Sequence, residues 1–161
     1  MISHERLKEL VHYDPETGIF TSKVKMRSKQ PDSALGTPRP DGYLNIGVDY
    51  GVYLAHRLAW FYMTGEWPAR QIDHRNKKKS DNRFKNLREA TNTQNHRNKP
   101  SYNLSGLKGV SKSKNRWMAR IKVNGTTIFL GRHASKERAH EAYCAAAAKY
   151  FGEFKCLETY Q

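Results

Sequence analysis

Residues 70–98 read RQIDHRNKKKSDNRFKNLREATNTQNHRN, and this stretch decides how the middle of the chain folds. Asp73 and His74 follow an isoleucine near the end of a predicted strand. A polar loop then extends over 75–82, and residues 87–90 form a short second strand. The two strands bring the Asp-His pair and the loop into one small module.

A capping box marks the helix that ends this stretch. Thr91 stands at the N-cap position, Gln94 follows three residues later, and the predicted helix carries Asn95. A strand, a loop, a strand and a helix in 29 residues bury too little apolar surface to fold alone. The stretch must therefore pack against the elements that precede it.

The preceding residues contain local signals for helices, turns and a hairpin. Residues 27–42 are rich in Ser, Pro, Gly and Asp and are predicted to form a loop. The other expected elements are a helix over 3–11 capped by Ser3, a turn at 14–18, a strand that begins at Ile19, a hairpin of 44–48 with 52–54, and a buried helix over 56–64 that stops at Gly65.

The C-terminal part predicts a three-stranded sheet with one helix. Strands are expected over 108–111, 116–123 and 126–131, the last two joined by a type I′ turn at Asn124-Gly125, and a helix over 135–151. One face of that helix carries Ala139, Ala142, Tyr143, Ala146 and Tyr150. A helix with this face can lie close on one side of the sheet and leave the other side open.

The positive charge of the chain is concentrated in its middle. The net charge is +14, and residues 70–101 and 104–132 each contribute +7, while the two ends are neutral. Charge at this density favours a polyanion as partner, nucleic acid above all. Membrane partners are not expected, because no apolar run approaches the ~18 residues of a membrane span. The N-terminus lacks the apolar region of a secretory signal, so a cytoplasmic setting is expected.

Four side chains of the central module suggest phosphodiester hydrolysis: Asp73, His74, Asn86 and Asn95. A carboxylate and an amide oxygen suit Mg²⁺ or Mn²⁺, and a histidine near neutrality can take a proton from water. No structural zinc is expected, because the two cysteines form no CxxC pair. Neighbours in a strand point to opposite faces, so Asp73 and His74 can share a site only where the strand ends or bends.

The pattern D-H-x(11)-N-L-R-x(6)-N resembles the HNH motif of phage-type homing endonucleases, the ββα-metal fold. The flanking stretches YLAHRLAWFYMTGEWP and DNRFKNLREATNTQNHRN match the same family. The resemblance implies His74 as general base, Asp73 and Asn95 as ligands of one divalent ion, and Asn86 as the residue that braces the loop. Arg88 and Arg97 are expected to contact DNA.

Residues 104–154 resemble an AP2 DNA-binding domain through GVSKSKNRWMARI, IFLGRH and AHEAYCAAAAKYFGEF. That fold is a three-stranded antiparallel sheet packed on a helix, and the sheet enters the major groove. The residues that the resemblance places against DNA are Lys108, Lys112, Arg116, Arg120 and Lys122. Trp117 and Phe129 match aromatic positions of the family and serve either the core or the DNA backbone.

Together these observations predict an α+β chain with four segments. They are a leader with a hairpin at 1–53, an HNH nuclease module at 54–98, a linker at 99–106 and an AP2-like domain at 107–156. The predicted function is a metal-dependent DNA endonuclease, with a non-cleaving DNA-binding regulator as the alternative. One motif per chain predicts a monomer that nicks double-stranded DNA, in the host cytoplasm if a phage encodes it.

For some side chains the sequence allows two roles. His56 with Arg57 could supply a second ligand pair, but a packing role at a helix start is favoured. Asn82 is the alternative to Asn86 as the bracing residue. The run Lys77-Lys78-Lys79 is either a solvated loop or a phosphate contact.

Overall fold

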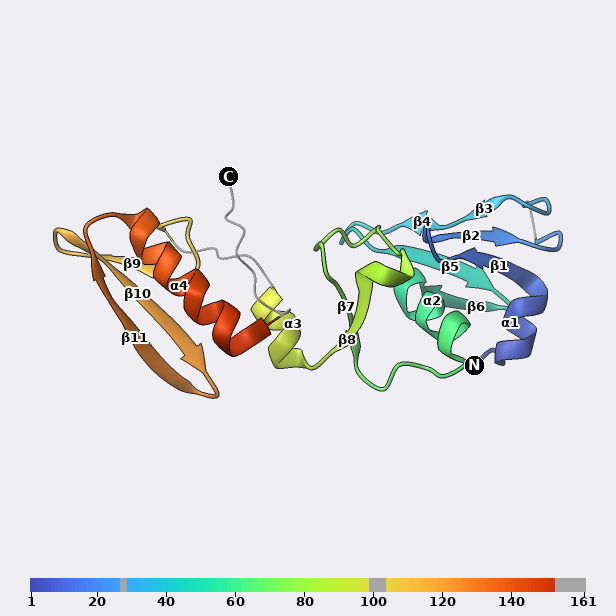
Figure 1. Ribbon diagram of the computed structural model, residues 1–161. Helices are drawn as coiled ribbons and strands as arrows, with labels where there is room; N and C mark the ends of the chain where they lie inside the picture. The colour runs from blue at the N-terminus through green and yellow to red at the C-terminus, as the bar shows by residue number, and fades with distance from the viewer. Residues whose placement is uncertain (27–28, 99–103, 153–161) are drawn as a thin grey trace. The chain divides into compact units, whose positions relative to one another are not determined.

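The computed structural model describes residues 1–26, 29–98 and 104–152. The fold is mixed α+β, with small antiparallel sheets and short helices (Figure 1). Two compact units divide the chain, Met1–Thr91 and Asn92–Gln161. In the described part of the chain, no helix combines the length and the apolar character that crossing a membrane requires.

The first unit contains two helices, one 3-10 turn and eight strands within its described residues. In chain order they are α1 (His4–Leu10), β1 (Val11–Asp14), β2 (Ile19–Ser22), β3 (Ala34–Leu35), β4 (Thr37–Pro38), β5 (Leu44–Val48), β6 (Gly51–Leu54), α2 (Ala55–Thr64), β7 (Gln71–His74), η1 (Phe84–Asn86) and β8 (Leu87–Ala90). They form the sheets β1-β2-β3, β4-β5-β6 and β7-β8.

Local signals place several of these elements, as predicted. The side chain of Ser3 accepts a hydrogen bond from the Arg6 amide at 3.2 Å and caps α1. Gly65 ends α2 with a φ of +78°, and Asp49 and Tyr50 turn the β5–β6 hairpin with φ of +48° and +61°. Positive φ at both central residues is the geometry of a type I′ turn.

The strands β1, β3 and β4 were not expected, and the prediction of a loop throughout 27–42 was wrong. In β1, Val11 and Tyr13 are buried and pair with β2, although the sequence there continues the helical pattern. The strands β3 and β4 have two residues each, and long-range pairing with β2 and β5 creates them. Such short strands carry no periodicity of their own.

One hydrophobic core runs through the whole first unit. Its buried residues extend from Ile2 in the leader, through Leu58 of α2, to Ile72 and Leu87 of β7 and β8. The module at 71–90 therefore packs against α2 and the leader. No separate core supports the boundary placed at 53/54 from the sequence, because the apolar faces on both sides are buried together.

The second unit is a three-stranded antiparallel sheet with a long helix against it. Its elements are α3 (Asn92–Asn98), β9 (Val110–Ser113), β10 (Arg116–Val123), β11 (Thr126–His133) and α4 (Lys136–Phe151), and the strand order is β11-β10-β9. Asn124 and Gly125 turn β10 into β11 with φ of +48° and +86°, as the Asn-Gly signal predicts.

The helix α4 covers one face of this sheet with small residues. Ala139, Tyr143 and Ala147 are buried against β9, β10 and β11. Gly109 permits the close approach, since a Cβ there would lie 2.0 Å from the Tyr143 ring. Tyr150 was predicted on the same face, but it is 41% exposed and lies outside the core.

Candidate active site and DNA-binding face

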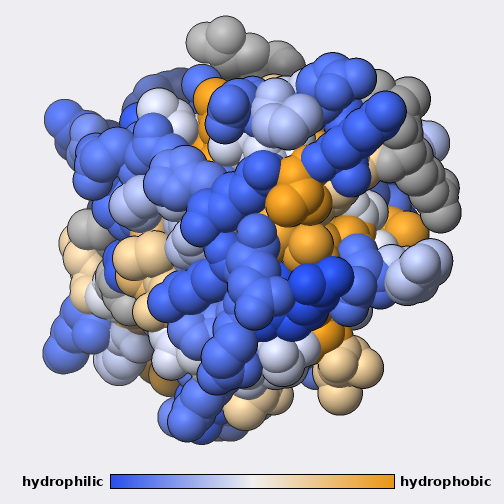
Figure 2. Space-filling view, turned by 90° about the vertical axis from the view of Figure 1, so that its right-hand side faces the viewer, coloured by the Kyte–Doolittle hydropathy of each residue, from blue (hydrophilic) through white to orange (hydrophobic). Residues whose placement is uncertain are grey.

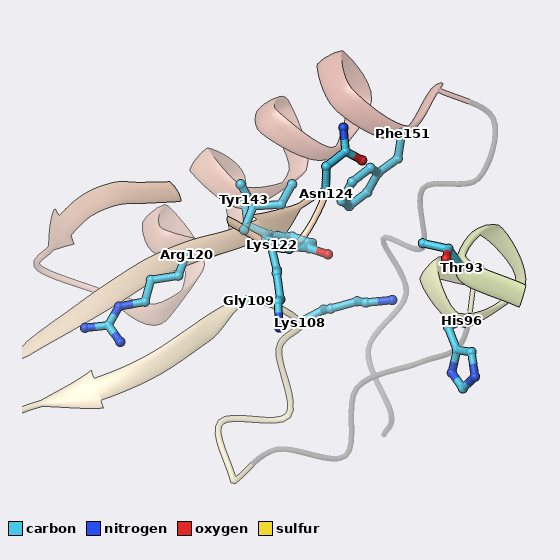
Figure 3. A pocket seen from close by; sticks show the side chains of 11 residues that line it. Thr93, His96, Lys108, Gly109, Arg120, Lys122, Asn124, Tyr143 and Phe151 are labelled. Carbon is cyan, nitrogen blue, oxygen red and sulfur yellow. The ribbon is translucent and has the colours of Figure 1, made fainter. Parts of the chain in front are cut away.

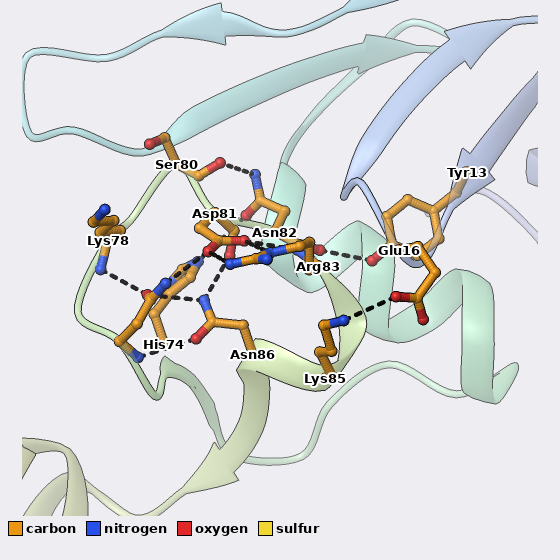
Figure 4. A network of polar contacts seen from close by, with 11 residues as sticks. Tyr13, Glu16, His74, Lys78, Ser80, Asp81, Asn82, Arg83, Lys85 and Asn86 are labelled. Carbon is orange, nitrogen blue, oxygen red and sulfur yellow. Dashed lines mark hydrogen bonds and ion pairs between the residues drawn. The ribbon is translucent and has the colours of Figure 1, made fainter.

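His74 closes strand β7 and is buried, with 3% of its surface exposed. Its Nε2 lies 3.3 Å from Oδ1 of Asn82, while the Asn82 amide nitrogen donates to the carbonyl of Ser80 at 3.2 Å (Figure 4). A carbonyl only accepts, so the Ser80 contact fixes the amide orientation and leaves Oδ1 facing His74. Nε2 must then carry the proton, and Nδ1 is the basic nitrogen of the ring.

Burial also sets the protonation state of His74. Loss of solvation lowers its pKa below the ordinary value, although the bond with Asn82 and the charge of Asp73 act in the opposite direction. A lowered pKa keeps the imidazole neutral near neutral pH, which is the form that can accept a proton.

Asn86 holds the loop that follows His74. Its Oδ1 accepts from the Asn76 amide at 3.0 Å, and its Nδ2 donates to the Asn76 side chain at 3.0 Å and to the Asp81 carbonyl at 2.8 Å. Asn82 makes no bond of this kind across the loop among the contacts described, and it contacts the histidine instead. The geometry therefore gives the two asparagines different tasks, Asn86 on the loop and Asn82 on His74.

His56 in α2 lies beside the candidate base. The two imidazole rings meet edge to face with centroids 5.1 Å apart, and the Tyr43 ring lies 4.9 Å from that of His56. Burial, with the nearby charges of His74 and Arg57, lowers the pKa of His56 to about 3. Within the described part of the chain, its Nδ1 is buried without a hydrogen-bond partner.

Arg57, the neighbour of His56, acts on the chain that leads to β7. Its guanidinium donates to the carbonyls of Pro68 and Arg70 at 3.1 and 3.2 Å. These contacts fix the segment just before the strand that ends in His74. His56 and Arg57 thus pack at the start of α2, as favoured from the sequence.

Asp73 is paired with Arg88 across the β7–β8 ladder. The two residues are direct partners in register, and Nε and Nη2 of Arg88 donate to the same Asp73 oxygen at 3.0 and 2.8 Å. Both are buried, with 5% of Arg88 and 7% of Asp73 exposed. Arg88 was predicted to contact DNA, but in the structure its side chain is buried and donates to the Asp73 carboxylate.

The sequence of this region matches a known family. A family model described as HNH endonuclease covers residues 53–97, a range that includes His56, Asp73, His74, Asn82 and Asn86. Residues 53–97 are thus similar to an HNH endonuclease domain.

A viral protein is similar over a longer stretch than this HNH domain. A protein of Acanthamoeba polyphaga mimivirus, named as an uncharacterized HNH endonuclease, is 34% identical over 112 residues. The match spans 68% of this chain and 59% of the mimivirus protein, so the chain covers about three fifths of its relative. No solved structure matches the chain.

The remaining positions of the HNH motif lie beyond β8. Asn95 belongs to α3, in the second unit, and its role as a metal ligand stays a prediction. The side chain of Arg97 lies outside the described residues. The described residues hold no group of three or more His, Cys, Asp or Glu that could bind a metal. A carboxylate with an amide oxygen still fits Mg²⁺, which takes few protein ligands and completes its shell with water and phosphate.

The second unit offers a basic surface on the sheet face opposite α4. Along β10, Ala119 and Ile121 are buried toward the helix, so the alternate residues face away from it. Strand register places Phe129 opposite Arg120, and Arg132 opposite Met118. The residues of this open face are Arg116, Met118, Arg120, Lys122, Thr127, Phe129 and Arg132.

The residues predicted to contact DNA lie on both faces of this sheet. Arg116, Arg120 and Lys122 lie on the open face, and Arg132 joins them although the sequence analysis missed it. Lys112 pairs with Trp117 in register and therefore lies on the side of α4.

Lys108 was also predicted to contact DNA, and Trp117 and Phe129 to serve the core or the DNA backbone, and the structure gives each a different environment. Phe129 is 56% exposed on the open face, while Trp117 packs against the core. Lys108 precedes β9 and lines a pocket with His96, Tyr143 and other residues (Figure 3). Figure 3 shows Arg120 directed away from Tyr143 and its helix. The two aromatic positions therefore have different environments, one in the core and one on the surface.

Hydrophilic residues cover most of the surface in the view of Figure 2, and hydrophobic residues show between them in smaller patches. This agrees with a mean hydropathy of −0.87 and a net charge of +14.

Proposed function

We propose that the protein is a metal-dependent DNA endonuclease that hydrolyses phosphodiester bonds. The observation that carries the proposal is the buried His74, whose Nε2 lies 3.3 Å from Oδ1 of Asn82 within the residues that match the HNH endonuclease family. A histidine fixed in one tautomer and kept neutral is suited to act as a general base.

In this reaction His74 removes a proton from the attacking water through Nδ1. The water oxygen forms a bond to phosphorus, the bond to the 3′-oxygen breaks, and the leaving oxygen takes up a proton. Asn82 keeps the ring oriented throughout, and Asn86 holds the loop on which Asn82 lies.

Asp73 would be a ligand of one divalent ion, Mg²⁺ or Mn²⁺, and the role of Asn95 as a second ligand stays a prediction from the motif. Such an ion supplies positive charge that stabilises the phosphate and the leaving oxygen. Arg88 contributes by fixing the Asp73 carboxylate through its pair of bonds at 2.8 and 3.0 Å.

Binding to double-stranded DNA is assigned to the open face of the second unit. Its three-stranded sheet with one helix supports the AP2-like assignment, and its exposed Arg120 and Lys122 suit phosphate or base contacts. One HNH motif per chain supports a monomer that nicks one strand, as in homing-type enzymes. The viral origin of the similar protein is in keeping with such a setting.

Incubation of supercoiled plasmid with the protein tests the proposal. With Mg²⁺, supercoiled DNA should convert to the nicked circle, and EDTA should stop the conversion. Binding without cleavage under Mg²⁺ and Mn²⁺ would favour the alternative, a non-cleaving DNA-binding regulator. Linear product without a nicked precursor would contradict the nicking monomer.

A further inference from the structure

A segment of the leader holds the loop that carries Asn82. The hydroxyl of Tyr13, at the end of β1, donates to the Asn82 carbonyl at 2.6 Å in a buried contact. Two residues further along the loop, the amide of Phe84 donates to the Pro15 carbonyl at 2.9 Å. The leader thus bonds to the loop backbone on both sides of Arg83.

Gly18 permits this contact to be so close. A Cβ at Gly18 would lie 2.4 Å from the Arg83 nitrogen and 2.5 Å from the Asn82 carbonyl carbon. Its φ of +75° is also one that residues with a Cβ rarely adopt. The turn of the leader is therefore pressed against the backbone of Asn82 and Arg83.

Asn82 connects this contact to the candidate base. Its backbone carbonyl accepts from Tyr13, and its side chain faces Nε2 of His74 (Figure 4). Asn82 is 1% exposed, so its backbone and side chain cannot move independently without disturbing packed neighbours. Burial raises the pKa of Tyr13, so the phenol keeps its proton and remains the donor.

We propose that Tyr13 is a positioning residue of the nuclease, acting on the tautomer and orientation of His74 through Asn82. The inference rests on the proposed function, with His74 as the base. It extends the site to a strand outside the range matched by the HNH family, which begins at residue 53. A small displacement of a catalytic group can cost about 10²-fold in rate.

The test compares Tyr13→Phe with Tyr53→Phe. Each variant removes one hydroxyl, but the Tyr53 hydroxyl accepts from the Ile2 amide at 3.3 Å, and no hydrogen bond to the loop is found for it among the described residues. Single-turnover nicking, DNA affinity and thermal midpoint are measured for both variants. The ¹⁵N signals of the His74 imidazole, assigned by their loss in His74→Ala, report the tautomer without any DNA or metal.

Tyr13→Phe should slow nicking about 10- to 100-fold with unchanged DNA affinity, and it should reduce the Nε2–H tautomer of His74. Tyr53→Phe should change the thermal midpoint alone. Wild-type nicking in Tyr13→Phe, or an unchanged His74 tautomer, would overturn the inference. If the wild-type protein cuts no DNA, the proposed function fails, while the imidazole signals still decide whether Tyr13 orients His74. If Tyr13→Phe does not fold, Gly18→Ala replaces it in the test. Its added methyl group would press on the Asn82 backbone and should shift the same imidazole signals.

Discussion

Arg88 donates twice to one oxygen of Asp73, at 2.8 and 3.0 Å, from the directly opposite position of a two-stranded sheet. The pair is almost completely buried, so each charge depends on the other for compensation. The carboxylate proposed to bind the divalent ion is therefore already held in place by the fold.

Arg88→Met should destabilise the first unit by about 3–5 kcal/mol, because it leaves the Asp73 carboxylate buried without its partner. Urea unfolding measures the loss, and the double variant Asp73→Asn with Arg88→Met should recover part of it. The exposed pair of Arg39 and Asp41, at 3.0 Å, provides the control. Arg39→Met should change the stability little, because solvent screens an exposed ion pair. Equal losses in the two single variants would contradict the buried pairing.

His74→Ala should lower strand cleavage about 10²–10⁴-fold and leave DNA binding nearly intact, since only the proton acceptor is lost. Single-turnover nicking with binding measured in parallel tests this, and added imidazole should restore part of the rate. His12→Ala, at an exposed position of β1, is the matched control. A His74→Ala variant that cuts at the wild-type rate would show that the site has been misplaced.

Stability should fall as the pH is lowered, because of His56. Its pKa is about 3 in the folded protein against 6.5 ordinarily, so between these values the unfolded chain binds a proton that the folded chain does not. The contribution of the neutral His56 to the free energy of unfolding is fully present above pH 6.5. It is lost as the pH falls toward 3, by at most about 1.4 kcal/mol per pH unit.

Urea unfolding between pH 7.5 and pH 4.5 measures this slope. His56→Phe keeps a ring beside His74 and Tyr43 but removes the titrating group, so its stability should vary less with pH. His12→Phe, at an exposed position, should keep the wild-type slope. An identical slope in wild type and His56→Phe would mean that His56 is not buried as a neutral ring.

The two faces of the C-terminal sheet should differ in DNA binding. Arg132→Ala on the open face should weaken binding and reduce the slope of log affinity against log salt by about 1. Lys112→Ala, on the side of α4, should change neither quantity appreciably. Filter binding over a salt series measures both, and equal effects of the two variants would refute a single DNA-binding face.

DNA affinity of the whole chain should depend steeply on salt. If ~6–10 phosphates are contacted, affinity should fall about 10³–10⁵-fold between roughly 50 and 200 mM salt. The reason is the net charge of +14, all of it within residues 70–132. A flat salt profile in the same titration would exclude phosphate contacts as the main source of affinity.

Elements with a strong local signal could be predicted from the sequence. Ser3 caps α1, Gly65 ends α2 and Asn124-Gly125 turns the last hairpin, because each signal acts on residues only a few positions away. The same holds for Asp73 and His74 at the end of β7. The motif spacing located these residues because the strand and the loop are short.

Partners distant in the sequence could not be predicted in the same way. Asn82 bonds to Tyr13 across 69 positions, and Arg88 reaches Asp73 across 15, so neither contact has a local pattern. The side of the sheet on which Lys112 lies depends on strand register, which moves a side chain to the other face with a shift of one residue. His56 was placed at the helix start, but its contact with His74 required the fold.

The single core from Ile2 to Leu87 also determines where the chain can be divided without exposing buried apolar surface. A chimaera joined at residue 53, where the family match begins, would expose the buried faces of α1, β1 and β5. A junction after Thr91 would cut between the compact units and leave that core whole. Another DNA-binding module should therefore be joined there in place of the second unit. A second chimaera should keep α3 as well, because it carries Asn95, the proposed metal ligand.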